Sequence, residues 1–410
     1  MKKVSNYCIK YININIKIFF IFFLSMLLFM EPKIINQKEE NAFYFKENKI
    51  NKEKKLNRYN KKKKKLNIGL YSNNGQDLKK IKKVGIIGLK HLKNVGNNLL
   101  KFAIYIQLKE LGVEPYIIGI HKISEDIRFL NRTTHPRIIK NFSEIKKNDY
   151  DILMVNSDQT WRKWPSYSSP SQFYDIAFLQ FSKNWEIPKF IYGASIGLDY
   201  WAFSKETDKM AKFLLKNFTG ISFREMRTIK YAREHLGINS TFVLDPTMLI
   251  NKNYYIEIIN NYKNKNKINN SDEYILTYKL DKMPNMELFI RTVQHQLKYK
   301  IYNINLNDDD YIEKFLYGIY HCKGVITNSY HAAIFAIIFN KPFVVFLYNW
   351  RGIGRFNTIK EVYGIKDRFF NNSKKPNLSL LKTPLKINYT LINFYKKISL
   401  EYLKKNLNII

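Results

Sequence analysis

The sequence is poor in the residues that build metal centres and disulfide frameworks. It has two cysteines, Cys8 and Cys322, and their positions match no zinc or iron–sulfur spacing. Its seven histidines are scattered, without a pair at the helical spacing of metal ligands. We therefore expect neither a disulfide framework nor a metal site.

Acidic residues are also scarce, with 34 Asp and Glu against 69 Lys and Arg, which gives a formal net charge of +35. Such a surplus is typical of proteins that bind nucleic acid or an anionic membrane surface. Here Lys, Asn and Ile crowd the whole chain, including its loops. We therefore interpret the charge as a solvated basic surface and expect no nucleic-acid partner.

The N-terminus lacks an apolar run that clearly spans a bilayer. The uncharged run from Ile18 to Met30 has about thirteen residues, whereas a spanning helix needs about twenty. Residues 1–30 fit the core of a signal peptide, although no small-residue cleavage site follows. If Lys10 and Lys17 reach back to the lipid surface, the segment instead fits a short anchor. A leader without a role in the function is the third reading, and the sequence leaves all three open.

The length of 410 residues suits two domains with extensions. A lysine- and asparagine-rich stretch without periodicity follows the leader, and a second polar stretch interrupts the globular part. No internal repeat is present. The predicted divisions are a linker at 31–82, an N-terminal α/β domain at 83–250, a connection at 251–272, a C-terminal α/β domain at 273–370, and a tail at 371–410 with a terminal amphipathic helix.

Short apolar runs alternate with helical patterns in both predicted domains. This alternation predicts an α/β fold with two facing Rossmann-like domains, each built on a parallel, doubly wound sheet. Ligands bind such sheets at the carboxyl ends of the strands. The terminal helix is expected to bury Leu391, Phe394, Ile398, Tyr402 and Leu403. The strands are predicted at 84–89, 115–120, 151–155, 190–194, 220–223, 241–244, 274–280, 300–306, 324–327 and 342–347.

Polar residues follow two strands of the first domain. Asn94, Gly96 and Asn97 precede its first helix, where a glycine allows close backbone approach and the helix N-terminus favours an anion. No dinucleotide fingerprint or P-loop is present, so an ordinary turn is equally compatible with these residues. Ser157, Asp158 and Gln159 follow the strand at 151–155. They predict either a ligand site or an Asx-turn.

Two charged residues lie at the ends of later strands in the same domain. Arg224 follows the strand at 220–223, where it is placed to bind a carboxylate or phosphate, or else to pair with Glu225 or another carboxylate. Asp245 ends the strand at 241–244 and either faces the ligand or caps the turn at Pro246.

In the second domain, the strand at 324–327 runs directly into an apolar helix that starts near His331. The positive end of the helix dipole favours a neutral imidazole, which suits acid–base chemistry on an anionic ligand. A core histidine bonded to backbone is the alternative. Arg351 and Arg355 flank glycines after the strand at 342–347, and they predict either an anion clamp or solvated loop charge.

Taken in order, these segments resemble the polysaccharide pyruvyl transferase family from about Val84 to Leu407. The family is similar in fold to two-domain, GT-B-like glycosyltransferases. The motifs that carry the resemblance are Asn94-Val95-Gly96-Asn97, Ser157-Asp158-Gln159-Thr160-Trp161, Tyr192-Gly193-Ala194-Ser195-Ile196-Gly197, Ile221-Ser222-Phe223-Arg224-Glu225, Leu244-Asp245-Pro246-Thr247, Ile326-Thr327-Asn328-Ser329-Tyr330-His331-Ala332 and Gly354-Arg355-Phe356.

The resemblance implies an enzyme that moves a pyruvyl group from phosphoenolpyruvate onto a sugar of a surface glycan, forming a ketal without a further cofactor. His331 would be catalytic and Arg224 would bind phosphoenolpyruvate. Members often carry an arginine where this chain has Ser329, and Arg351 or Arg355 is expected to replace it.

We expect the protein at the cytoplasmic face, with membrane association through the apolar leader. A transferase that uses a nucleotide-sugar donor and a non-catalytic glycan-binding protein remain the alternatives to pyruvyl transfer.

Overall fold

The computed structural model describes residues 80–89, 94–120, 128–165, 167, 169–268, 273–348, 352–371 and 375–409. The chain divides into two compact units, Met1–Lys79 and Lys80–Ile410, and the described residues belong to the second. The predicted signal or anchor at 1–30 lies outside the described residues, as does nearly all of the predicted linker. None of the helices in the described part has the length and apolar character needed to cross a membrane.

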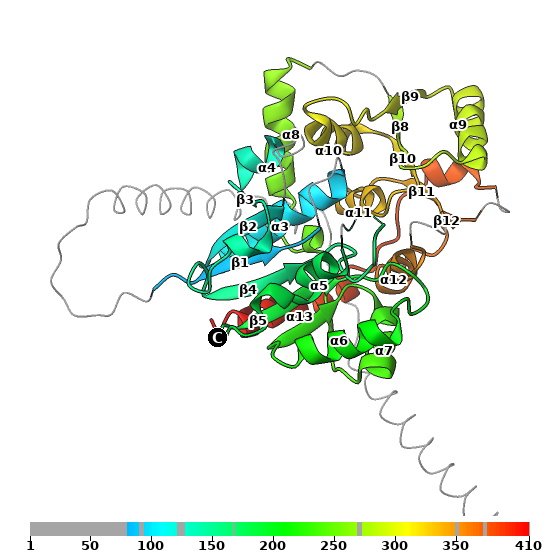
Figure 1. Cartoon of the computed structure of the whole chain (residues 1–410). Coiled ribbons are helices and arrows are strands. Elements are labelled where there is room, and N and C mark those ends of the chain that lie inside the picture. The colour runs from blue at the N-terminus through cyan, green and yellow to red at the C-terminus, as the bar shows by residue number, and fades with distance from the viewer. Residues whose placement is uncertain are drawn as a thin grey trace, which may run out of the picture. The chain divides into compact units, whose positions relative to one another are not determined.

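The first sheet contains seven parallel strands in the order β3-β2-β1-β4-β5-β6-β7 (Figure 1). The order reverses between β1 and β4, so the chain leaves these neighbouring strands toward opposite sides of the sheet. A crevice for ligands opens at such a switch point, at the carboxyl ends of the strands. The strands are β1 Lys83–Ile87, β2 Glu114–Ile120, β3 Arg137–Ile139, β4 Ile152–Asn156, β5 Lys189–Ala194, β6 Gly220–Phe223 and β7 Thr241–Phe242.

The second sheet contains five parallel strands in the order β12-β11-β10-β8-β9. Its switch point lies between β8 and β10, which are adjacent although β9 comes between them in the chain. Two parallel sheets with interleaved helices confirm the predicted α/β fold with Rossmann-like domains. The strands are β8 Tyr274–Tyr278, β9 Lys300–Asn303, β10 Gly324–Thr327, β11 Phe343–Phe346 and β12 Phe369–Phe370.

Helices occupy most connections between the strands (Figure 1). Their ends follow local chemistry: the Asn94 side chain accepts a hydrogen bond from Asn97 N and caps α3, and Ser169 with Pro170 starts α5. The helices are α3 Val95–Glu110, α4 Arg128–Thr133, α5 Pro170–Phe178, α6 Lys205–Leu215, α7 Met226–Leu236, α8 Asn253–Lys265, α9 Pro284–Leu297, α10 Tyr311–His321, α11 Tyr330–Ile338, α12 Gly354–Val362 and α13 Tyr389–Asn406. Short 3-10 helices lie at Phe142–Glu144, Gln180–Ser182, Pro246–Met248 and Leu378–Leu381.

The central strands of both sheets form the core. Strands β4, β5, β8, β10 and β11 are buried along their whole length, as expected for parallel strands covered on both faces. Strand β9 lies at an edge and is largely exposed. The core therefore holds the inner strands firmly, and these are the strands from which the site loops emerge.

Helix α8 lies within the polar segment that we interpreted as a connection between the domains. Its buried side chains Tyr255, Ile259 and Tyr262 recur at a helical spacing. The Tyr255 ring packs 4.9 Å from Phe335 of α11, and the Tyr262 ring packs 5.5 Å from Tyr317 of α10. The helix is therefore a packed element of the fold.

Helix α13 follows the second sheet in the chain but packs against the first, beside β5 (Figure 1). The Tyr402 hydroxyl donates to Ile191 O at 2.7 Å, and the Ser399 hydroxyl accepts from Leu244 N at 2.9 Å. The predicted stripe is wrong at Phe394, which is 56% exposed, whereas Tyr402 and Leu403 are buried as expected. The buried face of α13 also includes polar residues that form hydrogen bonds to the sheet, and a prediction based on the spacing of apolar residues does not include them.

Candidate active site

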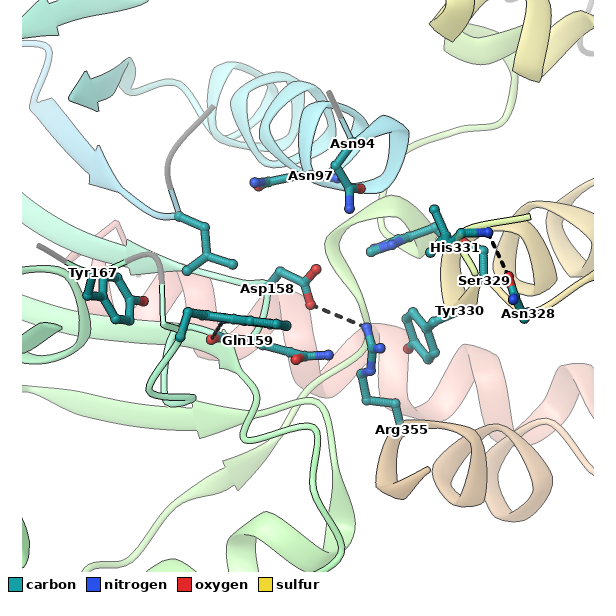
Figure 2. A pocket seen from close by; sticks show the side chains of 13 residues that line it. Asn94, Asn97, Asp158, Gln159, Tyr167, Asn328, Ser329, Tyr330, His331 and Arg355 are labelled. Atoms are coloured by element: carbon teal, nitrogen blue, oxygen red, sulfur yellow. Dashed lines mark hydrogen bonds and ion pairs between the residues drawn. The ribbon is translucent and has the colours of Figure 1, made fainter. Parts of the chain in front are cut away.

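A pocket lies where the carboxyl ends of both sheets meet (Figure 2). The loops after β1 and β4 supply its wall from the first sheet, and those after β8 and β10 supply its wall from the second. These strands flank the two switch points, so sheet topology determines where the pocket forms. The lining residues are Leu89, Asn94, Asn97, Asp158, Gln159, Trp164, Tyr167, Leu280, Asn328, Ser329, Tyr330, His331 and Arg355.

The first turns of α3 and α11 border this pocket. Asn94 caps α3, and its side chain accepts from Asn97 N at 3.1 Å. Ser329 caps α11, and its hydroxyl accepts from Ala332 N at 3.4 Å. Two helix N-termini therefore face one pocket, and their dipoles favour an anionic ligand there.

His331 points into the middle of the pocket, toward Asp158 and Arg355 (Figure 2). Its side chain is 5% exposed, and Nε2 is buried with no hydrogen-bond partner in the described part of the chain, 3.8 Å from Asp245 Oδ2. Burial lowers the pKa of His331 to about 4, against the opposing effect of Asp245 and Asp158. The imidazole is consequently neutral near pH 7 and available as a base.

Arg224 lies beneath the pocket in a buried charge network. Its guanidinium donates to the carboxylates of Asp158 and Asp245, and it packs 4.8 Å from the centre of the Tyr330 ring. Burial lowers the pKa of Arg224, but the two carboxylates outweigh burial and raise it above its usual value. Arg224 is therefore always charged, and both of its amino groups are already bonded.

Asp158 connects this buried network to the pocket. Burial raises the pKa of its carboxyl, but the charges of Arg224 and Arg355 outweigh burial and lower it below the usual value. Arg355 Nη1 lies 3.7 Å from Asp158 Oδ1, and its guanidinium lies 5.0 Å from the centre of the Tyr330 ring. Burial also lowers the pKa of Arg355. Among the described residues, the pocket is thus lined by Arg355, while Arg224 lies behind Asp158 and Tyr330.

The family model for polysaccharide pyruvyl transferases matches residues 94–349. The chain belongs to the polysaccharide pyruvyl transferase family. This membership confirms the resemblance inferred from the motifs and makes the chain a member of a transferase family that acts on glycans. No curated protein matches the chain.

Several solved structures are similar to this pyruvyl transferase family member. A UDP-GlcNAc 2-epimerase from Neisseria meningitidis aligns with a TM-score of 0.48 at 9% identity, over 80% of this chain and 98% of that one. MnaA from S. aureus, solved with UDP, aligns with a TM-score of 0.46 at 13% identity, over 81% and 98% of the two chains. HepE from Anabaena, in complex with UDP and glucose, aligns with a TM-score of 0.44 at 10% identity, over 80% and 98%.

Seven of the predicted site residues of this pyruvyl transferase family member lie together at the pocket surface. Four others lie behind the pocket or beside it. Arg224 and Asp245 form the buried network, and Asp245 Oδ1 also accepts from Thr247 N at 3.0 Å, so it caps the turn as well. Gly96 lies against the His331 ring. Ser157 is fully buried, and Arg351 lies outside the described residues. Those at the surface are Asn94, Asn97, Asp158, Gln159, Ser329, His331 and Arg355.

Three aromatic residues of the pocket were not predicted. Tyr330 separates the two arginines, and Trp164 and Tyr167 line the pocket on the side of the first sheet. Arg162 covers Trp164 at 4.3 Å from the ring centre. Tyr330 could have been predicted as a site residue because it lies between the candidates Ser329 and His331. Adjacent residues at the start of a helix lie beside the same group of loops. Trp164 and Tyr167 follow the motif at 157–161 in an irregular loop, where sequence patterns indicate no direction.

Lys101 was also missed. It is buried on α3, one helical turn after Asn97, and its amine donates to Leu89 O at 3.0 Å. Burial lowers the pKa of Lys101 to about 7. The lysine-rich composition hid this residue, since nothing in the sequence separates one buried lysine from the many exposed ones.

Proposed function

We propose that this protein transfers the pyruvyl group of phosphoenolpyruvate to a sugar of a surface polysaccharide and forms a cyclic ketal on two of its hydroxyls. The observation that carries the proposal is the pairing of a buried, neutral histidine with Arg355 at a pocket bordered by two helix N-termini. This combination suits a substrate that is strongly anionic and needs proton transfer.

The donor carries a phosphate and a carboxylate, and both need positive partners. Arg355 supplies a guanidinium at the pocket surface, and the first turns of α3 and α11 supply backbone dipoles. Ser329 stands where family members often have an arginine, and it caps α11 with its hydroxyl. In this proposal the helix end and Arg355 together do what that arginine would do. Arg224 acts indirectly, because it fixes Asp158 and Tyr330 from below.

The chemistry requires two additions at one carbon. A sugar hydroxyl first bonds to C2 of phosphoenolpyruvate while C3 gains a proton and becomes a methyl group. A second hydroxyl then bonds to C2 as the C2–O bond to phosphate breaks, and its proton leaves with the phosphate. His331 accepts the proton of the first hydroxyl and returns it to C3. A neutral imidazole begins this cycle as a base, which agrees with its lowered pKa.

Ligand-induced thermal stabilisation of the full-length protein tests the donor. A ligand that binds the native state alone raises the midpoint of unfolding. We expect phosphoenolpyruvate to raise it in the parent protein and much less in Arg355→Ala, while a panel of nucleotide-sugars leaves it unchanged. A rise with a nucleotide-sugar alone would replace pyruvyl transfer with glycosyl transfer. The absence of a response to every donor would favour a glycan-binding protein without activity.

Phosphate release in the presence of candidate oligosaccharides tests the reaction itself. We expect release that depends on both phosphoenolpyruvate and an acceptor and that stops in His331→Ala. Mass spectrometry of the acceptor should show the added pyruvyl group. In line with the family, we place this reaction at the cytoplasmic face of a membrane.

A further inference from the structure

Gly96 and His331 meet where the first turns of α3 and α11 come together at the site. Gly96 is the second residue of α3, which follows β1, and His331 is the second residue of α11, which follows β10. A methyl group at Gly96 would lie 1.9 Å from Nδ1 of His331, 2.3 Å from Cγ and 2.6 Å from Cε1. The imidazole therefore packs directly on the backbone of α3.

No other residue type fits this contact. Ordinary van der Waals contact for a methyl carbon begins at 3.4 Å, so even alanine at Gly96 forces the ring to move by more than an ångström. The helical conformation itself does not require glycine, because the φ of Gly96 is not among the positive values of the described residues. The requirement at Gly96 comes from the imidazole.

The opposite side of the ring faces a buried carboxylate. Nε2 of His331 is buried and has no hydrogen-bond partner among the residues that the structure describes, and Asp245 Oδ2 lies 3.8 Å from it. The other charged groups near the ring are Asp158, Arg224 and Arg355. Asp245 is held in turn by Arg224 and by Thr247, so it cannot follow a displaced ring easily. The imidazole thus lies between a rigid carboxylate and the bare backbone of α3.

We infer that Gly96 is a positioning residue that places the His331 imidazole, by allowing it to rest on the first turn of α3. This role differs from the substrate binding that the sequence suggested for Gly96. It concerns the position of one ring, and it therefore holds or fails independently of which donor the enzyme uses.

A double-mutant cycle in the full-length protein separates this role from a general packing role. Gly96→Ala should lower the thermal midpoint of the parent protein, because the methyl group and the ring compete for one space. In the His331→Gly background the ring is gone, and the same change should leave the midpoint unchanged or raise it, since alanine favours helix over glycine. The sign of the effect therefore depends on the histidine.

Gly318→Ala is the matched control. Gly318 is also a helical glycine, on α10, and a methyl group there would lie 2.8 Å from Leu276 Cδ1, with no pocket residue among its nearest neighbours. Its effect on the midpoint should be the same in the parent and His331→Gly backgrounds. An equal effect of Gly96→Ala in both backgrounds would overturn the inference, because the methyl group would then clash with something other than the ring.

A spectroscopic readout tests the position of the ring directly. The protein has seven histidines, and the proton resonance that disappears in His331→Gly belongs to His331. In the parent protein this resonance should titrate near pH 4, and in Gly96→Ala it should move toward the ordinary value because a displaced ring meets water. An unchanged titration in Gly96→Ala would show that the ring has not moved, and the inference would fail.

The kinetic readout rests on the proposed function. Where phosphoenolpyruvate-dependent transfer is measured, Gly96→Ala should lower kcat by about 100-fold, as expected for a catalytic group displaced by about 1 Å, with a much smaller change in KM for the donor. A normal kcat in Gly96→Ala, in a protein that performs the transfer, would refute the positioning role and leave the function standing.

Discussion

Replacing Arg224 by methionine is expected to destabilise the protein strongly, which distinguishes it from the residues at the pocket surface. Arg224 is 2% exposed and is bonded to two buried carboxylates, Asp158 and Asp245. Methionine has a similar volume but no charge, so the two carboxylates would remain buried without their main partner. Removal of one member of a buried ion pair typically costs about 3–5 kcal/mol. From the sequence alone, Arg224 could be replaced with little loss of stability; the buried network predicts otherwise.

The pH dependence of the stability loss in Arg224→Met provides a second, independent test of this prediction. In the parent protein the pKa of Asp158 is lowered, so its contribution to stability is present above the unfolded pKa and is lost as pH falls through the folded one. Without Arg224, burial should instead raise the pKa of Asp158 above the unfolded value. The native state of Arg224→Met would then bind a proton more readily than the unfolded state. Its deficit relative to the parent should therefore shrink between about pH 7 and pH 5.

Urea denaturation at both pH values measures these differences, and Lys230→Ala provides a control. Lys230 forms an exposed pair with Glu234 at 3.8 Å, and exposed helical pairs contribute about 0.3–0.5 kcal/mol. If Arg224→Met lost no more stability than Lys230→Ala, the buried network would not hold the fold and the reasoning would be refuted. A deficit that is independent of pH would contradict the part of the argument that concerns Asp158.

Three further predictions follow from the same site. The pH profile of kcat/KM, which reports the free enzyme, should fall on the acidic side near pH 4 rather than near 6.5, because burial lowers the pKa of His331; a break near 6.5 would place the ring in water. Arg355→Lys should raise the donor KM by about tenfold or more, because lysine cannot bind a carboxylate or phosphate bidentately, while Lys360→Arg on the same helix should leave KM unchanged. Removal of residues 1–79 should leave the urea midpoint unchanged, whereas removal of residues 1–83 should lower it. The longer deletion removes the hydrogen bonds from the Lys82 amine to Leu407 O and from Lys83 N to the Asp151 carboxylate. Equal midpoints for the two truncated proteins would show that these bonds do not contribute to stability.

The parallel sheets were predictable because strand and helix patterns alternate clearly in this chain. The strands at 220–223 and 324–327 agree with the structure in both bounds, and the helix at 389–406 was also found. Helix α8 was missed because Lys and Asn crowd its exposed face and hide Tyr255, Ile259 and Tyr262. Strand β7 ends at Phe242, two residues earlier than expected, because Leu244 N bonds to Ser399 of α13. Such contacts depend on a helix about 155 residues away in the chain, and local patterns carry no information about them.

The residues of the site were easier to find than their roles. Each strand end could be read from the sequence, so Asp158, Arg224 and Asp245 were all selected as candidates. Their pairing follows from strand order: β4, β5, β6 and β7 are consecutive in the sheet, which brings the ends of β4 and β7 to either side of Arg224. The sequence does not contain this order in any local form. It therefore left open whether Arg224 binds a ligand or pairs with a carboxylate of the protein, and the structure shows pairs with two carboxylates.

Charge balance explains how the site can tolerate Ser329 in place of an arginine. Arg224 and Arg355 are matched by Asp158 and Asp245 in the buried network, so the resting pocket has no large excess of positive charge. An additional arginine at position 329 would lie at the start of α11, beside two arginines that already flank Tyr330. Ser329 instead caps the helix, and the helix dipole supplies a fixed partial positive charge without a mobile side chain. Among the described residues, the pocket therefore combines two helix N-termini and the guanidinium of Arg355 with a neutral His331, an arrangement that suits the anionic donor proposed above.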